Sequence, residues 1–294
     1  MKPKIDLSDP QTQKWLHIFN QRRALAWKAA MKLNDAIRSV FFHFPGKQHP
    51  EQTGTCVLLH LNGSYFVLSA AHVLEDCGKH QIQIGCGAQL HAINGERFST
   101  VPGPSGAHRD DPADVAVVHI QGEVPAEIKE SSASLSDLDF SALTEPRSFF
   151  ITKGFRAKES WATGNTAWST LESFGSVEYP DKEYLHMGIN RDHQIALAYE
   201  EELLVDGKLQ NSPIPKGMSG GAMIRIRGVP MDPQIEVSPA PTPRIAAILI
   251  EYHPRGNDTK PRLIGARVQH HLRVISRHMP ETGTWIQSQL RQDR

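Results

Sequence analysis

Short apolar runs separated by turn residues are the feature of this chain that most constrains its fold. Gly54–Leu61 and Ser64–Ala70 are rich in β-branched or aromatic residues and have Asn62-Gly63 between them. Asn-Gly between two such runs is a strong hairpin signal. The strand–helix alternation that a parallel sheet needs does not appear in the sequence. The pattern therefore predicts a mainly β fold built from antiparallel strands.

The same pattern divides the chain into two β units. Further strands are expected at Ser39–Phe44, Gln81–Ile84, Gln89–Ile93, Asp114–Ile120, Ser148–Thr152, Thr166–Glu172, Leu185–Ile189, Gln194–Ala198, Ala222–Arg227, Ile245–Tyr252 and Pro261–Val268. The stretch between the fourth and fifth of these is polar and serine-rich, which is typical of a linker. We expect a first β unit over residues 36–125, a linker over 126–147 and a second β unit over 148–268.

Helices are expected at both ends of the chain. Asp9 can cap a helix that has Pro10 in its first turn. Apolar residues then recur at three- and four-residue steps, which predicts one helical face: Trp15, Ile18, Phe19, Leu25, Ala29 and Leu33. An amphipathic basic helix over residues 1–35 could bind a membrane or a partner, but we expect its apolar stripe to dock on the domain that follows. The segment 269–294 contains two more helical candidates, Gln269–Arg277 and Thr284–Leu290.

Charge is unevenly distributed along a chain whose formal net charge is zero. Residues 1–38 carry eight Lys or Arg against three Asp, and residues 260–294 carry seven against two acids. Basic ends can bind nucleic acid, but these lack interleaved aromatic residues and any reader motif, so no nucleic-acid partner is expected. We expect both ends to fold back onto the acidic body.

Cysteine usage and hydropathy indicate the compartment. The three cysteines cannot all pair internally, and they lie at no metal-ligand spacing, so we expect neither a metal site nor a cofactor. The chain begins without the apolar run of a signal peptide, and its apolar runs are far shorter than the ~18 residues of a membrane span. We expect a protein of the cytoplasm that does not bind membranes.

One serine lies in a stretch crowded with prolines and glycines, residues 211–221, which read N-S-P-I-P-K-G-M-S-G-G. Glycines permit backbone angles that are closed to other residues, so the N–H groups of Gly217 and Ser219 can turn to the same side. Two such amides form a pocket for a developing oxyanion. A serine there acts as a nucleophile only if a base lies close to it.

A histidine and a carboxylate precede that serine along the chain. His72 ends the apolar run Tyr65–Ala71, and Asp114 opens the apolar run that ends at Ile120. A single histidine after a strand is more often structural than catalytic, and an acid that opens a strand often makes a turn. Taken together, the three residues each lie at the edge of a buried strand, where a rigid scaffold can hold them.

These segments resemble a known family. Ser69-Ala-Ala-His72, Asp114-Val-Ala-Val and Gly217-Met-Ser-Gly-Gly221 are similar to the three signatures of trypsin-like (chymotrypsin-fold) serine proteases, and the chain looks like an intracellular, single-domain member of bacterial type. The order His, Asp, Ser matters, because unrelated hydrolases place these residues in other orders. The resemblance covers roughly residues 36–278.

The resemblance implies two antiparallel six-stranded β-barrels with the active site between them. It implies a serine endopeptidase acting on a protein or peptide substrate, in which Ser219 is the nucleophile, His72 the base and Asp114 its orienting acid. Asp110 and Asp111 are rival carboxylates, but they lie in the loop rather than at the strand edge. The amides of Gly217 and Ser219 would bind the oxyanion. The expected substrate-binding residues are Lys216, Ile250, Glu251 and Tyr252.

Two departures from the family qualify that resemblance. Met218 stands where digestive members carry an acid that pairs with a newly released N-terminus, so we expect no activation of that kind. The acid that selects Lys or Arg substrates would fall near Pro213, so trypsin-like substrate preference is not expected. Substrate choice stays open, and an unregulated protease would be hazardous, so a regulatory protein partner is possible; the proline-rich stretch 230–243 and the N-terminal helix are where its contacts would be sought.

Three rival interpretations stay open. The G-x-S-x-G pattern at Ser219 also fits an α/β-hydrolase esterase, which needs a helix after the serine and then an acid and a histidine such as Asp258 and His270. A protease fold that serves only as a binding module would carry the same motifs. Metal-dependent hydrolysis would need a metal-binding spacing among the fifteen histidines, and none is present. His253, His270 and His271 are expected at the surface.

Overall fold

The structure, a computed structural model, describes residues 8–78, 81–140, 148–205, 208–230, 232–256 and 259–292. Its strands are β1 Ile37–Phe42, β2 Glu51–Leu61, β3 Ser64–Ala70, β4 Ile82–Cys86, β5 Gln89–Ile93, β6 Gly95–Ser99, β7 Val115–Ile120, β8 Ser148–Thr163, β9 Thr166–Val177, β10 Gln194–Ala198, β11 Glu202–Val205, β12 Lys208–Asn211, β13 Ala222–Pro230, β14 Thr242–His253 and β15 Arg262–Arg267. Its helices are α1 Pro10–Ala30, α2 Ala71–Glu75, α3 Ala126–Ser131, α4 Asp181–Met187, α5 Val268–His278 and α6 Pro280–Gln292, with short 3₁₀ helices η1 Met31–Ala36, η2 His108–Asp110 and η3 Leu135–Asp137.

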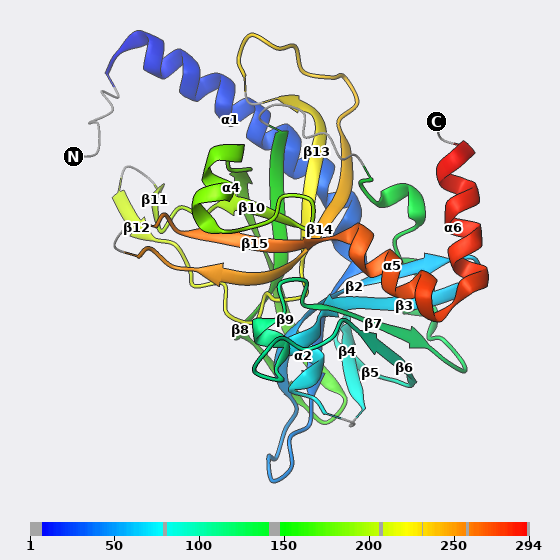
Figure 1. Ribbon diagram of the computed structural model, residues 1–294. Helices are drawn as coiled ribbons and strands as arrows, with labels where there is room; N and C mark the ends of the chain where they lie inside the picture. The colour runs from blue at the N-terminus through cyan, green and yellow to red at the C-terminus, as the bar shows by residue number, and fades with distance from the viewer. Residues whose placement is uncertain are drawn as a thin grey trace.

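A 13-stranded antiparallel sheet organises the described chain. Its order is β10-β15-β14-β13-β8-β9-β5-β4-β1-β2-β3-β7-β6, and β11 and β12 form a separate hairpin. The strands before residue 121 and those after residue 147 form two consecutive stretches of this sheet, joined by the Gln89–Thr166 pair. Figure 1 shows the two groups of strands crossing near the middle of the molecule. The prediction of a mainly β, antiparallel fold is confirmed.

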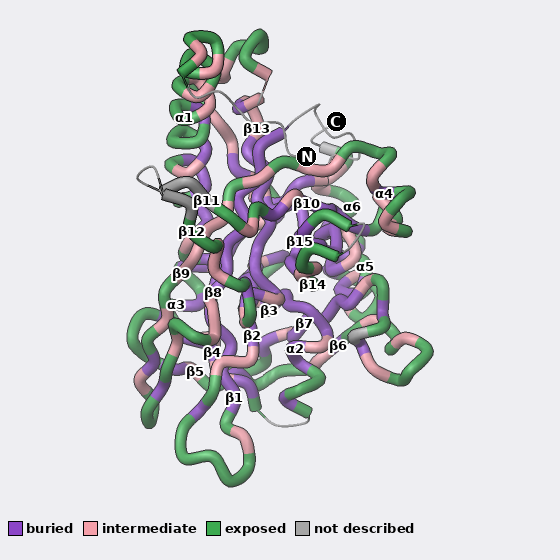
Figure 2. The backbone as a smooth tube through the Cα atoms, turned by 90° about the vertical axis from the view of Figure 1, so that its left-hand side faces the viewer, coloured by how far each residue is buried: buried purple, intermediate pink, exposed green. Residues whose placement is uncertain are grey.

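The core lies between the strands and under the terminal helices. Figure 2 shows buried positions concentrated along the strands, with exposed ones at the loops and along much of α1. The C-terminal helix α5 leaves β15 and packs on β6 and β7 (Figure 1), so the end of the chain covers strands from its first half. Because of this packing, the two groups of strands share one covering helix.

The predicted N-terminal helix forms, but its buried face is shorter than expected. Asp9 caps it, accepting a hydrogen bond from the Thr12 amide at 2.8 Å. The buried apolar side chains are concentrated near its C-terminal end, at Ala26, Ala29 and Ala30, and continue with Leu33 in η1. Trp15 is exposed because the first half of α1 extends beyond the strands (Figure 1), and Leu25 in the second half is exposed as well.

Arg22 fixes α1 to the proline-rich excursion between β13 and β14. Its guanidinium is buried and donates to the backbone carbonyls of Pro230, Asp232, Pro233 and Ile235. A guanidinium has five N–H donors in a planar fork, which lets one side chain satisfy several carbonyls of a loop. The helix therefore docks on the second β unit through a charged residue as well as through its apolar end.

Other predicted elements differ from those in the structure. Leu185–Ile189 was expected to be a strand, but Leu185 lies in α4, which ends at Gly188 with a φ of 66°. Short apolar runs do not distinguish strand from helix by periodicity, and here Leu185 is exposed while Tyr184 is buried. The expected linker contains α3 and η3, whose Ile128 and Leu135 are buried; residues 141–147 lie outside the described chain.

Candidate active site

His72 and Asp114 are brought together by the pairing of β3 with β7. Ala70 at the end of β3 pairs with Val115 at the start of β7, so the residues just beyond these ends are neighbours. The Ala71 amide donates to the Asp114 carbonyl at 3.0 Å, and the His72 amide donates to Asp114 Oδ1 at 2.9 Å. Asp114 adopts a left-handed backbone conformation with a φ of 45°, which Asp tolerates better than most residues. The carboxylate is thereby turned back toward α2.

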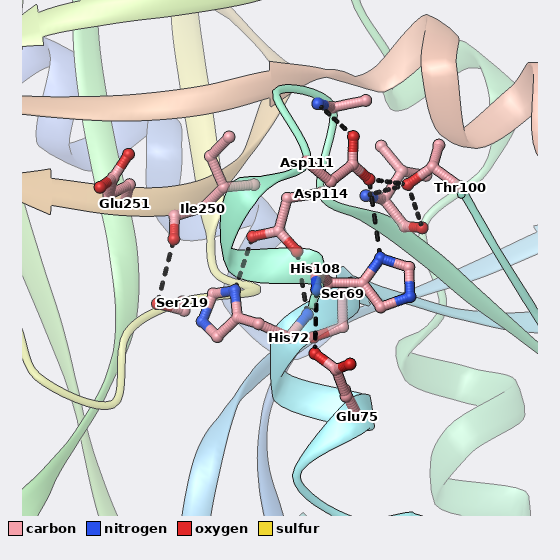
Figure 3. Close-up of polar contacts among 12 residues, drawn as sticks. Ser69, His72, Glu75, Thr100, His108, Asp111, Asp114, Ser219, Ile250 and Glu251 are labelled. Carbon is pink, nitrogen blue, oxygen red and sulfur yellow. Dashed lines mark hydrogen bonds and ion pairs between the residues drawn. The ribbon is translucent and has the colours of Figure 1, made fainter. Parts of the chain in front are cut away.

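The two side chains form a short hydrogen bond. His72 Nδ1 lies 2.6 Å from Asp114 Oδ2, and the side chains are 20% and 7% exposed, respectively. Burial raises the pKa of Asp114, while its hydrogen bonds to His72 act in the opposite direction. A carboxylate only accepts hydrogen bonds, so Nδ1 carries the proton and Nε2 of the neutral ring is left free to accept one. Figure 3 shows this second nitrogen on the side of the ring that faces Ser219.

Backbone hydrogen bonds hold the turn that carries Ser219. Each carbonyl from Lys216 to Ser219 accepts a hydrogen bond. The donors are, in order, the Ala157 amide (3.0 Å), the Gln52 and Thr55 side chains (3.2 and 3.0 Å), the Gly221 amide (2.9 Å) and the Thr55 amide (2.8 Å). Gln52 and Thr55 belong to β2, so the group of strands before residue 121 supplies three of the hydrogen bonds that hold this turn.

These bonds determine which way the amides of the turn point. In a trans peptide the N–H points opposite to the preceding C=O. The Lys216 and Met218 carbonyls are engaged within the protein, so the N–H groups of Gly217 and Ser219 point away from those partners. Neither N–H donates to a protein acceptor among the described residues. Two unengaged amides on the same turn can bind an oxyanion, and they are the pair singled out from the sequence.

Two glycines are required for this geometry. Gly217 and Gly220 have φ values of 92° and 88°, in the region that favours glycine. A Cβ on Gly220 would lie 1.8 Å from the Thr55 carbonyl oxygen and 2.3 Å from Ser69 Oγ. The turn that carries Ser219 is therefore pressed directly against β2 and β3, and no side chain fits at position 220.

The Ser219 hydroxyl lies in the same cavity as the histidine and the acid. The cavity measures about 330 Å³, and its lining includes His72, Asp114 and Ser219. Ser219 Oγ lies 3.4 Å from the Ile250 carbonyl, the limit of a hydrogen bond, and no hydrogen bond joins it to His72 in the described chain. Catalytic hydrogen bonds are often long in a protein without substrate and shorten when substrate binds.

The expected substrate-binding residues divide into two groups. Ile250, Glu251 and Tyr252 line the cavity, but Lys216 is exposed on the turn itself and is not part of that lining. His253 Nε2 lies 2.7 Å from Glu251 Oε2. Three of the expected residues therefore lie in the same cavity as Ser219, and the fourth contributes its backbone carbonyl to the turn.

The rival carboxylates occupy different positions from Asp114. Asp110 and Asp111 also line the cavity. Asp111 is buried, accepts hydrogen bonds from Thr100 Oγ1 and the Ala113 amide, and lies 3.6 Å from the ring of His108 (Figure 3). Asp111 braces the loop that carries Asp114, whereas Asp114 is the acid that contacts His72.

Gln52, Thr55 and Gln194 are site residues that the sequence patterns missed. The first two hold the serine turn, and Gln194 lines the cavity and donates to the Pro112 carbonyl at 2.6 Å. They lie 82 to 165 residues along the chain from these partners, and no local pattern marks them. Only the pairing of distant strands brings them to the site.

His271 was wrongly expected at the surface. It is completely buried on the inner face of α5, and its Nε2 lies 3.1 Å from the Ser69 carbonyl, to which it donates. Burial lowers the pKa of His271 to about 4, so its ring is neutral at pH 7. The histidine therefore links the C-terminal helix to the strand that leads to His72.

Three further features of the described residues concern metal binding, cysteines and membrane spans. No group of three or more His, Cys, Asp or Glu in the described ranges could hold a metal ion. Cys56, Cys77 and Cys86 are buried and unpaired. None of the described helices is both long enough and apolar enough to cross a membrane.

No protein-family model and no curated protein matches the chain.

Proposed function

We propose that this protein is a serine endopeptidase in which His72, Asp114 and Ser219 form the catalytic triad. One observation carries the proposal: a buried His–Asp pair and a serine on a turn with two unengaged amides line a single cavity. The first feature supplies a base with an acceptor nitrogen, and the second supplies a nucleophile with a site for negative charge. A structural role for either one does not require the other beside it.

The reaction proceeds in two halves. Ser219 Oγ attacks the scissile carbonyl carbon, its proton passes to His72 Nε2, and the amides of Gly217 and Ser219 bind the oxyanion. The C–N bond breaks as the histidine returns that proton to the leaving amine. Water, deprotonated by the same nitrogen, then attacks the acyl-enzyme, and the C–Oγ bond breaks with the proton returning to Ser219. Asp114 holds the ring and stabilises its charged form throughout.

The proposal extends to the family and the architecture. The two consecutive stretches of the sheet are the two β-barrels of the trypsin-like fold, the first supplying His72 and Asp114 and the second supplying Ser219. The hydrogen bonds from Gln52 and Thr55 to the serine turn support this assignment, because they join β2 of the first stretch to the turn that precedes β13 of the second. An esterase of the α/β-hydrolase type is disfavoured because the strand β13, not a helix, follows Ser219. Of the acid and histidine it would use, Asp258 lies outside the described residues and His270 is on α5.

Labelling with a fluorophosphonate tests the function directly. The wild type is expected to be labelled, Ser219→Ala to be unlabelled, and His72→Ala to be labelled far more slowly. Ser212→Ala is the matched control, since it removes a serine of the same stretch and should leave labelling intact. Folded wild-type protein that does not react would instead indicate a binding module. Labelling that persists in Ser219→Ala would mean that Ser219 is not the nucleophile.

A further inference from the structure

A second cavity of about 600 Å³ lies beside the catalytic one. The two share Asp111, Pro112 and Gln194 in their walls, so they are neighbouring parts of one depression in the surface. The far wall of the second cavity is the helix α5, which contributes Arg273 and Arg277 (Figure 1 shows the helix). None of the roles proposed above uses these two arginines.

Two exposed guanidinium groups of this wall have no carboxylate partner among the described residues. Arg273 and Arg277 lie one helical turn apart and are exposed. Within the described ranges, neither forms an ion pair with a carboxylate. Residues four apart on a helix lie on the same face, so the two charges are directed to the same region. Arginine is well suited to bind carboxylate and phosphate groups because its planar fork presents paired donors.

The histidines of this wall are oriented by the arginine beside them. Arg273 Nη1 lies 3.5 Å from His270 Nδ1, and His270 Nε2 lies 3.0 Å from His193 Nδ1. A guanidinium can only donate, so His270 Nδ1 accepts and its proton is on Nε2. That proton is donated to His193 Nδ1, which leaves the His193 proton on Nε2. Burial lowers the pKa of His270 to about 4, consistent with a neutral ring at pH 7.

The carboxylate in this cavity is already engaged. Among the described residues that line it, Asp111 is the only acid, and it is buried with hydrogen bonds from Thr100 and Ala113. The exposed polar groups on the α5 side are therefore donors. A donor-rich wall with two positive charges favours an anionic ligand over a neutral or cationic one.

We propose that this second cavity binds acidic side chains of a polypeptide whose neighbouring residues lie in the catalytic cavity. The assignment rests on the proposed function, since it makes the acidic segment part of the substrate. A peptide fits better than a free anion for two reasons: the cavities adjoin, and the lining of the second also includes apolar groups of Pro112, Ala113 and Val274. The protein thus selects substrates with Asp or Glu a few residues from the scissile bond.

Binding to the inactive full-length Ser219→Ala protein tests this without requiring cleavage. Two fluorescein-labelled decapeptide pools are compared by fluorescence polarisation at low salt, each randomised except for a fixed Glu-Glu or Gln-Gln pair. The Glu pool should bind about fivefold more tightly, as expected for two exposed charge pairs. That preference should vanish when Arg273→Gln and Arg277→Gln are added and should persist with Arg291→Gln, which removes an exposed arginine on α6. Equal binding of the two pools, or a preference that survives the double substitution, would overturn the proposal.

Two further measurements identify the source of the anion and separate this inference from the proposed function. If glutarate or inorganic phosphate binds through the two arginines while the Glu pool shows no preference, the cavity takes free anions and the peptide assignment is wrong. In the wild type, the Glu pool should slow fluorophosphonate labelling more than the Gln pool does; binding without slowing would show that the peptide does not reach the catalytic cavity. Normal labelling with no Glu preference refutes only this inference, whereas a Glu preference without any labelling refutes the peptidase and leaves a peptide-binding protein.

Discussion

The two sides of the candidate site are held together in different ways. The histidine side depends on side chains: a carboxylate with a raised pKa contacts the ring and backbone of His72. The serine side depends on the backbone: four consecutive carbonyls are hydrogen-bonded, and two glycines adopt positive φ. Substitutions on the first side should therefore change chemistry or pH response, whereas substitutions on the second should change stability.

The largest effect is expected from Asp114→Asn. Asn tolerates the left-handed backbone, but it cannot hold His72 in the tautomer that leaves Nε2 free. Turnover of a peptide substrate should fall about 10⁴-fold, near 5.5 kcal/mol of barrier. Steady-state kinetics measure this loss, and Asp110→Asn is the matched control, because it neutralises an exposed acid of the same cavity that does not contact His72.

The same variant should be at least as stable as the wild type. Burial raises the folded-state pKa of Asp114, so its carboxyl group favours the folded state only while it is protonated. This stabilisation is lost as pH rises through the folded-state pKa. At pH 7 the ionised acid therefore costs stability, and an uncharged Asn does not. A turnover loss below tenfold, or a loss that simply follows unfolding in urea, would contradict the assigned role.

The contrast between the two sides also explains what the sequence could predict. His72, Asp114 and Ser219 each follow or open a recognisable apolar run or glycine-rich turn, so local patterns pointed to all three. The strands β3, β5 and β10 were predicted with their observed bounds. These features depend on residues that are close together in the chain.

Features that depend on distant residues were not predictable in this way. The hydrogen bonds from Gln52 and Thr55 to the serine turn cross more than 160 residues of chain. The burial of His271 follows from the packing of α5 on strands of the first half, and a polar residue on a helix gives no sign of this. The α4 segment was misread because a short apolar run fits either a strand or a helix.

On the serine side, Gly220→Ala should lower the free energy of unfolding more than the control substitution Gly63→Ala does. The added methyl group would overlap the Thr55 carbonyl at 1.8 Å, and φ is 88°. Backbone strain and overpacking together should lower the free energy of unfolding by about 4 kcal/mol. Urea denaturation measures this change. Gly63→Ala is the matched control: Gly63 has a φ of 76° with no atom within 4 Å of the added Cβ, so only the strain, about 1 kcal/mol, remains. Equal losses in the two variants would mean that the turn is not pressed against β2.

On the histidine side, His271 should make the free energy of unfolding depend on pH, an effect smaller than the one expected from Gly220→Ala. The folded-state pKa is about 4 and the ordinary value is 6.5, so protonation favours the unfolded chain. The contribution of this residue is complete above pH 6.5 and is lost as pH falls through 4, and it amounts to about 3 kcal/mol at most. Urea denaturation at pH 7 and at pH 4 measures the loss.

His271→Gln separates this contribution from those of other groups. Glutamine can still donate to the Ser69 carbonyl, but it does not titrate, so the variant should lose less stability than the wild type between pH 7 and pH 4. His270, whose pKa is also lowered to about 4, keeps its own share in both proteins. His17→Gln makes the same change at an exposed position on α1 and should leave the wild-type pH dependence unchanged. If His271→Gln also leaves it unchanged, the ring is not buried in neutral form against β3, and the histidine side is held by the Asp114 contacts without support from α5.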